Sequence, residues 1–145
     1  MKIAGNYTLA LPQQRAYDAM QDPTILSKCM PGIDEMVKTG ENEYTMKMKM
    51  ALASISSLFS GKVKIVDQNP ITSFRLVVEG SGKVGFMKGD GVLKLSEVEG
   101  GTLVDYEGDV QVGGTIASVG QRLIDTTAKM MIKRFFDKMA EEGAK

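Results

Sequence analysis

Alternating apolar and polar residues run through the middle of the chain and predict a series of β-strands. The clearest stretch is residues 43–52, where every second residue is apolar and lysines fall between them. A period of two places alternate side chains on opposite faces of a strand, so one face would meet a core and the other solvent. Similar stretches are residues 2–9, 57–67, 72–82, 91–98 and 102–112, with a glycine-rich connection before residue 91. One apolar face per strand is typical of an antiparallel sheet that is solvated on its other side.

Two short helices are expected between the first strand and the others. Residues 12–20 begin with a proline and carry apolar residues at helical spacing. A second helix opens at Asp22-Pro23 and is closed by Pro31-Gly32.

A longer helix is predicted at residues 116–139, with Ser118 as its N-cap and Gln121 three residues later. Its apolar side comprises Val119, Leu123, Ile124, Thr127, Ala128, Met130, Met131, Phe135 and Met139. The opposite side is charged, so the helix must lie against another surface. The simplest arrangement is an α+β fold in which a curved antiparallel sheet wraps around this helix.

Composition narrows the function. The 145 residues suit a single domain over residues 1–145, and a formal net charge of zero argues against binding nucleic acid. There is no histidine and only one cysteine, which removes the commonest general base, histidine-based triads and cysteine-rich metal sites. No apolar run is long enough to span a bilayer and the N-terminus lacks a signal-peptide core, so a cytoplasmic location is expected.

Four short segments carry a resemblance to a known family. They are Cys29-Met30-Pro31-Gly32, Tyr106-Glu107-Gly108-Asp109-Val110, Gly113-Gly114 and Gly120-Gln121-Arg122-Leu123. In their order and spacing, the whole chain resembles the CoxG family of carbon monoxide dehydrogenase subunits, within the START-related helix-grip (SRPBCC) superfamily. The resemblance implies a helix-grip fold of about seven strands around the C-terminal helix, with an apolar cavity between sheet and helix.

The resemblance also implies a function. CoxG-like proteins are associated with molybdenum-containing CO dehydrogenases, with membrane recruitment and with a quinone-like electron acceptor. The favoured hypothesis is therefore a non-catalytic binder of a quinone or other isoprenoid or lipid-like molecule, serving such a dehydrogenase, with peripheral contact at the inner membrane face. The alternative is an adaptor that recruits the enzyme to the membrane by surface contacts and has a sealed core. A cyclase or hydrolase that uses a carboxylate or Tyr106 is less favoured.

The expected ligand site lies where the apolar face of the sheet meets that of the helix. Its predicted lining is Met46, Met48, Phe74, Leu76, Tyr106, Leu123, Thr127, Met130 and Met131. The hydroxyls of Tyr106 and Thr127 would orient one polar end of the ligand, while the methionines adapt to the rest. No cofactor or metal is expected.

Other features have ordinary explanations that the sequence favours. The segment from Gly80 to Gly85 matches G-x-G-x-x-G, but no helix is expected after it, so a flexible connection is favoured over a phosphate loop. Cys29 is interpreted as a small apolar residue, because no histidine is present to activate it. Lys47, Lys49, Lys62, Lys64 and Arg75 are expected on outward faces, either as a solvated surface or as a basic stripe for an acidic partner.

Overall fold

The computed structural model describes residues 1–30, 32–52 and 55–145. This part of the chain forms a seven-stranded antiparallel sheet, three α-helices and a short 3-10 helix. The strands are β1 (Lys2–Leu9), β2 (Ile33–Gly40), β3 (Glu43–Leu52), β4 (Ile55–Asn69), β5 (Ser73–Gly82), β6 (Gly85–Val98) and β7 (Gly101–Gly113). The helices are α1 (Gln13–Ala19), α2 (Pro23–Cys29), η1 (Thr115–Val119) and α3 (Gln121–Gly143).

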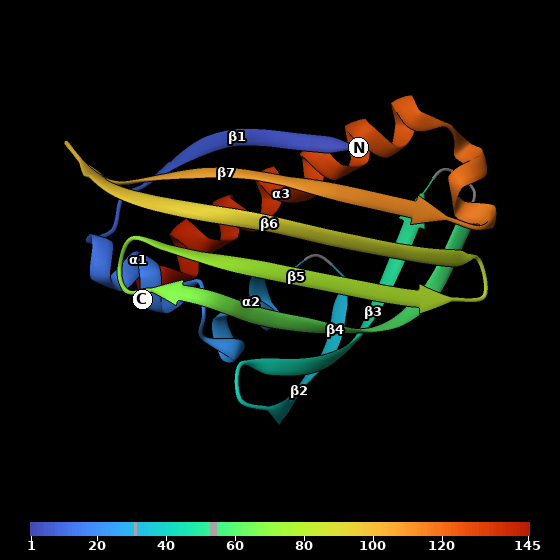
Figure 1. The fold of residues 1–145 in the computed structure, drawn as a ribbon, viewed down its shortest axis with the longest axis horizontal. Coiled ribbons are helices and arrows are strands. Elements are labelled where there is room, and N and C mark those ends of the chain that lie inside the picture. The colour runs from blue at the N-terminus through green and yellow to red at the C-terminus, as the bar shows by residue number, and fades with distance from the viewer. Residues whose placement is uncertain (31, 53–54) are drawn as a thin grey trace.

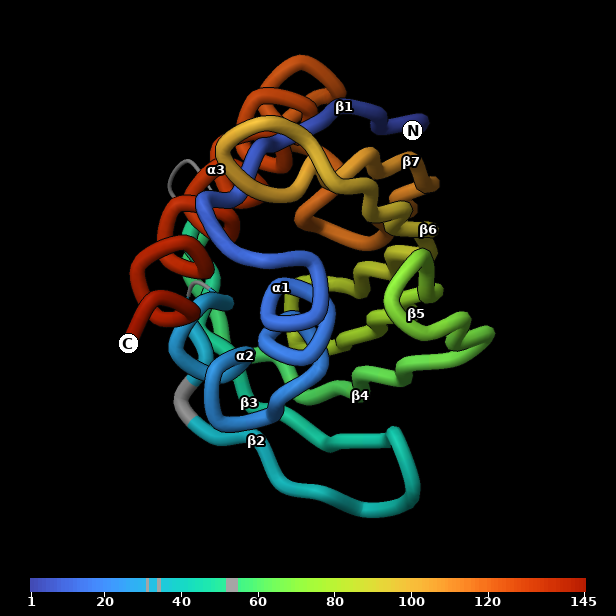
Figure 2. The backbone as a smooth tube through the Cα atoms, turned by 90° about the vertical axis from the view of Figure 1, so that its left-hand side faces the viewer, coloured from blue at the N-terminus to red at the C-terminus, as the bar shows by residue number. Residues whose placement is uncertain are grey.

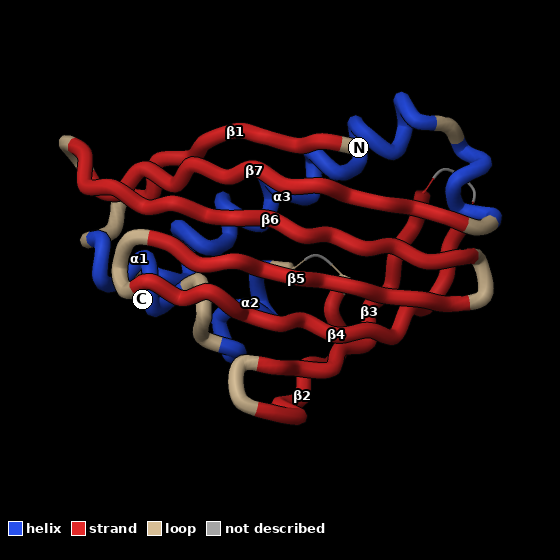
Figure 3. The backbone as a smooth tube through the Cα atoms, viewed as in Figure 1, coloured by secondary structure: helices blue, strands red, loops and turns tan. Residues whose placement is uncertain are grey.

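The sheet curves around α3. Its strand order is β1-β7-β6-β5-β4-β3-β2, and α3 runs along one side of it while β2 and β3 bend round (Figure 1). An end view shows the sheet on one side, α3 on the other, and α1 and α2 closing the near end (Figure 2). Short loops join most strands (Figure 3). The predicted α+β architecture is therefore confirmed, including the two short helices after the first strand.

Strand faces follow the alternation in the sequence. In β3 the side chains of Tyr44, Met46, Met48 and Met50 are buried, while Lys47 and Lys49 are exposed. The expected glycine-rich connection is instead mostly strand, because Lys83-Val84 forms a two-residue turn and β6 already begins at Gly85. The alternation therefore continues through glycines, which carry no side chain to reveal it.

Two elements differ from the sequence-based expectation. Strand β2 is not predicted as a separate element, because register shifts between Ile33 and Glu35 and between Lys38 and Gly40 break its alternation. The long helix begins at Gln121 and not near Ser118. Gly120 precedes it with a φ of 99°, and the Ser118 hydroxyl donates to the Thr115 carbonyl within η1. A residue with positive φ interrupts a right-handed helix, which explains the later start.

The short helices begin as predicted. The Asp22 carboxylate accepts a hydrogen bond from the backbone N–H of Thr24 and caps α2, which has Pro23 in its first turn. Helix α2 ends at Cys29, and Pro31, which was expected to close it, lies outside the described residues. Helix α1 is fastened to the sheet because the Tyr17 hydroxyl donates to the Ser73 carbonyl at 3.1 Å.

Buried apolar residues form two clusters. The first joins α1, α2 and the end of α3 to the sheet, and includes Leu26, Phe74, Phe136 and Met139. The second lies near η1 and comprises Met48, Met50, Phe59, Ile116 and Ile124. Among the described residues, no helix combines the length and apolar character that crossing a membrane requires.

Candidate ligand-binding cavity

A cavity of about 300 Å³ lies between the sheet and the middle of α3. Helix α3 contributes one wall, made by Ile124, Thr127, Ala128, Met131, Ile132 and Phe135. Strands β5, β6 and β7 contribute the facing wall. These two walls come from the period of three and four along the helix and the period of two along the strands, which is the arrangement that the sequence predicted.

Glycines hollow the sheet wall. Gly89 and Gly91 of β6 and Gly108 of β7 all line the cavity. The strand register places Gly91 opposite Gly108, and Gly89 between Val78 and Val110. At the centre of this wall the backbone is therefore not covered by side chains of its own strands, and valines and Leu76 surround this area.

An aromatic group forms one end of the cavity. The ring of Phe136 stacks between those of Tyr7 and Tyr106, with centroid distances of 5.2 Å and 5.5 Å. The Tyr7 hydroxyl donates to the Asp137 carboxylate at 2.6 Å, which fixes this side of α3 to β1 and raises the pKa of Tyr7. The Tyr106 hydroxyl lies directly over Gly5 of β1, at a point where any side chain would collide with it.

Four of the nine predicted site residues line the cavity. They are Leu76, Tyr106, Thr127 and Met131. Tyr106 and Thr127 are the two of these that carry a hydroxyl. These four residues are the part of the predicted site that the structure brings together.

The other five lie elsewhere. Phe74 is buried in the first cluster beneath the ring of Tyr17, with a centroid distance of 5.8 Å. Met48 belongs to the second cluster and Leu123 packs against it. Met46 is buried opposite Gly61 of β4. The side chain of Met130 is 43% exposed and does not line the cavity.

The sequence analysis missed several lining residues. Besides the glycines, Met30, Met50 and Met87 line the cavity, so together with Met131 four methionines surround it. The alternation places Met50 on the inward face of its strand but does not assign it to the site. Met87, Gly89 and Gly91 would have been found by extending the period of two backwards from Leu93, and Gly108 by filling the gap between Tyr106 and Val110.

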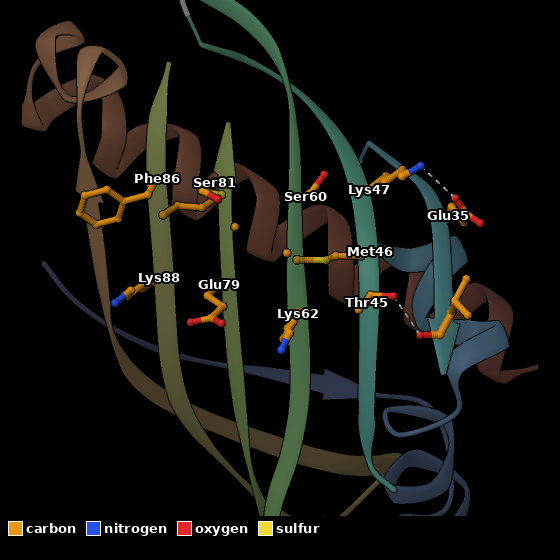
Figure 4. Close-up of a pocket in the computed structure, with 14 residues that line it drawn as sticks. Glu35, Thr45, Met46, Lys47, Ser60, Lys62, Glu79, Ser81, Phe86 and Lys88 are labelled. Carbon is orange, nitrogen blue, oxygen red and sulfur yellow. Dashed lines mark hydrogen bonds and ion pairs between the residues drawn. The ribbon is translucent and has the colours of Figure 1, made fainter. Parts of the chain in front are cut away.

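A second hollow lies on the outer face of the sheet. It has a volume of about 710 Å³, and strands β2 to β6 cross it (Figure 4). Its lining includes Lys47, Lys62 and Lys88 together with Glu35 and Glu79. Lys47 pairs with Glu35 at 3.8 Å, and Lys62 pairs with Glu43 at 3.6 Å. The outward lysines are thus interspersed with acids instead of forming a uniform basic stripe, and this open charged hollow suits an apolar ligand less well than the inner cavity.

The charged residues Lys88, Asp90, Glu107 and Asp109 also border the inner cavity, but the alternation along β6 and β7 turns their side chains to the outer face. Burial, with a contribution from the nearby Glu142 carboxylate, raises the pKa of the Cys29 thiol to about 11, which disfavours the nucleophilic thiolate. Asp90 and Asp109 face outward, and their pKa values are lowered by hydrogen bonds from Arg75 and the N-terminal amine respectively.

The glycine motif from Gly80 to Gly85 spans the β5–β6 hairpin, so the helix that a phosphate loop needs does not follow it. In the described ranges, no group of three or more acidic or cysteine side chains is placed to hold a metal ion.

The curved sheet around the C-terminal helix, with a cavity between the two, defines a helix-grip domain. Crystal structures with the same fold include Ara h 8.0201, with a TM-score of 0.70 and 14% identity over 99% of this chain and 97% of that one. Another is the Zhui aromatase/cyclase from Streptomyces sp. R1128, with a TM-score of 0.67 and 8% identity over 99% of this chain and 93% of that one. At these identities the likeness shows the fold alone.

Sequence identifies the family. A conserved protein from Geobacillus kaustophilus shares 29% identity with a TM-score of 0.94, over 99% of this chain and 95% of that one. Residues 5–143 match the model of the CoxG family of carbon monoxide dehydrogenase subunits, and the chain belongs to this family. No curated protein matches the chain.

Proposed function

We propose that this protein binds an apolar small molecule, a quinone or another isoprenoid or lipid-like compound, in the cavity between the sheet and α3. The observation that carries the proposal is the cavity itself, because a sealed core would have favoured an adaptor that works only through its surface. The surface that it exposes is almost entirely apolar, with Tyr106 and Thr127 as the hydroxyl-bearing side chains, and the charged residues that border it in β6 and β7 turn their side chains outward. A largely apolar pocket with a few polar groups is typical of small-molecule sites.

The size of the cavity limits what it holds. About 300 Å³ lies at the small end of the range for ligand pockets, roughly 300–1,000 Å³. An engineered apolar cavity of about 150 Å³ is enough to bind benzene. The cavity therefore has room for a ring system or a short chain, and a long prenyl tail would extend beyond it.

As proposed, the protein binds its ligand and does not convert it chemically. General acid–base chemistry is most often carried by a histidine, which the chain lacks, or by a carboxylate within hydrogen-bond reach of the ligand. Asp90 is instead held by Arg75 on the outer face, and Asp109 by the N-terminal amine. Membership of the CoxG family supports a role as accessory to a molybdenum CO dehydrogenase-like enzyme, and a lipid-like ligand would require peripheral contact with the membrane.

The test uses two adjacent methionines that the structure distinguishes. Met131 lines the cavity, whereas Met130 is exposed beside it. We expect Met131→Trp to fill the cavity and reduce affinity for 2-methyl-1,4-naphthoquinone at least tenfold, measured by equilibrium dialysis and absorbance. Met130→Trp should bind like the parent, and circular dichroism should show both variants folded. If the parent binds no quinone, fatty acid or isoprenoid saturably, the adaptor becomes the better hypothesis.

A further inference from the structure

Gly89 occupies a position where glycine has no evident structural purpose. It lies in the interior of the 14-residue strand β6, and its φ is not positive, so its backbone conformation is open to any residue. A Cβ placed there would meet no atom within 4 Å. Glycine weakens the interior of a strand and often marks a place where a ligand approaches the backbone closely.

The neighbouring glycines differ in this respect. A Cβ on Gly108 would come within 2.6 Å of the Asp90 carbonyl oxygen, and one on Gly91 within 3.2 Å of the Glu107 carbonyl oxygen. These two glycines face each other and allow β6 and β7 to lie close together. Only Gly89, of the three, leaves space that the strands themselves do not need.

The area of backbone without side chains has a definite size. Gly89 and Gly91 are two residues apart along β6, about 7 Å, and Gly108 lies one strand away, about 5 Å. Across the cavity the two smallest side chains of the α3 wall are Ala128 and Thr127. The space is therefore bounded by peptide backbone on one side and by small side chains on the other.

The surrounding side chains also favour a ring. Met30, Met50, Met87 and Met131 line the cavity, and a thioether makes favourable contacts with the edge of an aromatic ring. A linear alkyl chain gains nothing comparable from these sulfurs and does not need a flat surface.

We propose that the backbone at Gly89, Gly91 and Gly108 forms a platform on which a planar ring of one or two fused rings lies flat, facing Thr127 and Ala128 of α3. Gly89 is then the position that determines specificity for planar over linear ligands. This inference rests on the proposed function and names the part of the ligand that the cavity recognises.

The test compares a planar and a linear probe of similar carbon number, 2-methyl-1,4-naphthoquinone and 1-decanol. Affinities are measured by equilibrium dialysis, with absorbance for the quinone and gas chromatography for the alcohol. The parent should bind the quinone at least tenfold more tightly. Gly89→Val should lose at least tenfold in quinone affinity and less than threefold in decanol affinity, because a flexible chain can avoid the new side chain.

The melting temperature distinguishes a loss of quinone affinity from misfolding of the variant. Valine is favoured in strands and fills open space here, so the melting temperature of Gly89→Val should rise. Gly89→Ala should show a smaller loss of quinone affinity. The matched control is Gly40→Ala in β2, where a Cβ makes only ordinary contact with Glu43 and binding should not change.

The two hypotheses fail differently. If the parent binds both probes saturably but Gly89→Val keeps its quinone affinity, or loses affinity for both probes equally, the platform is wrong and the cavity remains a binding site. If the parent binds neither probe nor any fatty acid or isoprenoid, the proposed function itself fails.

Discussion

Single residues decide where the interior is hollow and where it is packed. Met130 and Met131 are neighbours within one broad apolar arc of α3, yet one is exposed and the other lines the cavity. Consecutive helical residues point about 100° apart. The helical pattern predicted which side of α3 is apolar. It did not predict where the buried part of that side ends, because this depends on the neighbouring elements.

The sheet residues show the same limit. The alternation in β3 and β5 correctly predicted that Met48 and Phe74 face inward, and both are buried. Some inward-facing side chains of the sheet are covered by α1, and others face the cavity beside α3. The tertiary arrangement of the helices decides which, and the alternation does not. Phe74 lies beneath Tyr17 of α1, whereas Leu76, two residues further along β5, lines the cavity.

The buried thiol gives a test at the residue scale. With its pKa raised to about 11, Cys29 at pH 8 should carry roughly a hundredfold less thiolate than a cysteine with the ordinary value of 9.0. We expect alkylation by iodoacetamide to be at least that much slower in the folded protein than in urea. A native rate within a few-fold of the unfolded rate would contradict the burial of this side chain.

At the scale of elements, α2 and α3 are joined through one carboxylate. Glu142, near the end of α3, is buried and lies 3.8 Å from Lys28 of α2, with Lys138 at 3.5 Å and Lys145 at 3.2 Å. The hydrogen bond from Lys145 and the charges of the other lysines lower the pKa of Glu142 below its ordinary value of 4.5. Its contribution to stability is therefore present above pH 4.5 and is lost as the pH falls through the folded-state pKa.

Glu142→Gln should consequently be less stable than the parent at pH 7, and the two should converge as the pH falls from about 5 towards 3. The measurement is the urea midpoint, followed by circular dichroism, at several pH values. Glu141→Gln is the matched control, because this neighbouring side chain is 61% exposed and, among the described residues, forms an ion pair only with Lys138. A deficit for Glu142→Gln that stayed constant down to pH 3 would show that charge at this position is not the cause.

The elements themselves were largely predictable. Strict alternation predicted β3, and a proline after an aspartate predicted the start of α2. Strand β2 could not be predicted in this way, because its register shifts remove the period on which the prediction depends. The start of α3 was also placed too early, since Ser118 and Gln121 match a capping box although Gly120 interrupts the helix between them.

At the scale of the whole molecule, the curvature of the sheet creates two hollows of different character. The inner one is apolar and has α3 as one wall, and the outer one is lined by charges of both signs. The sequence predicted the two faces by their alternation. It did not specify their depth, because depth depends on the bending of the sheet and on glycines such as Gly61 and Gly89 that leave no side chain.

The central claim is that the inner cavity is a ligand site, and the methionines provide the most direct measurement. The chain has eleven methionines, whose methyl groups can be labelled with ¹³C and observed by NMR. On titration with 2-methyl-1,4-naphthoquinone, the signals of Met30, Met50, Met87 and Met131 should shift saturably and together, because these side chains line the cavity. Met20 and Met139, buried in the first cluster, and the exposed Met130 should not shift. The absence of a saturable shift at the four cavity methionines would contradict the account.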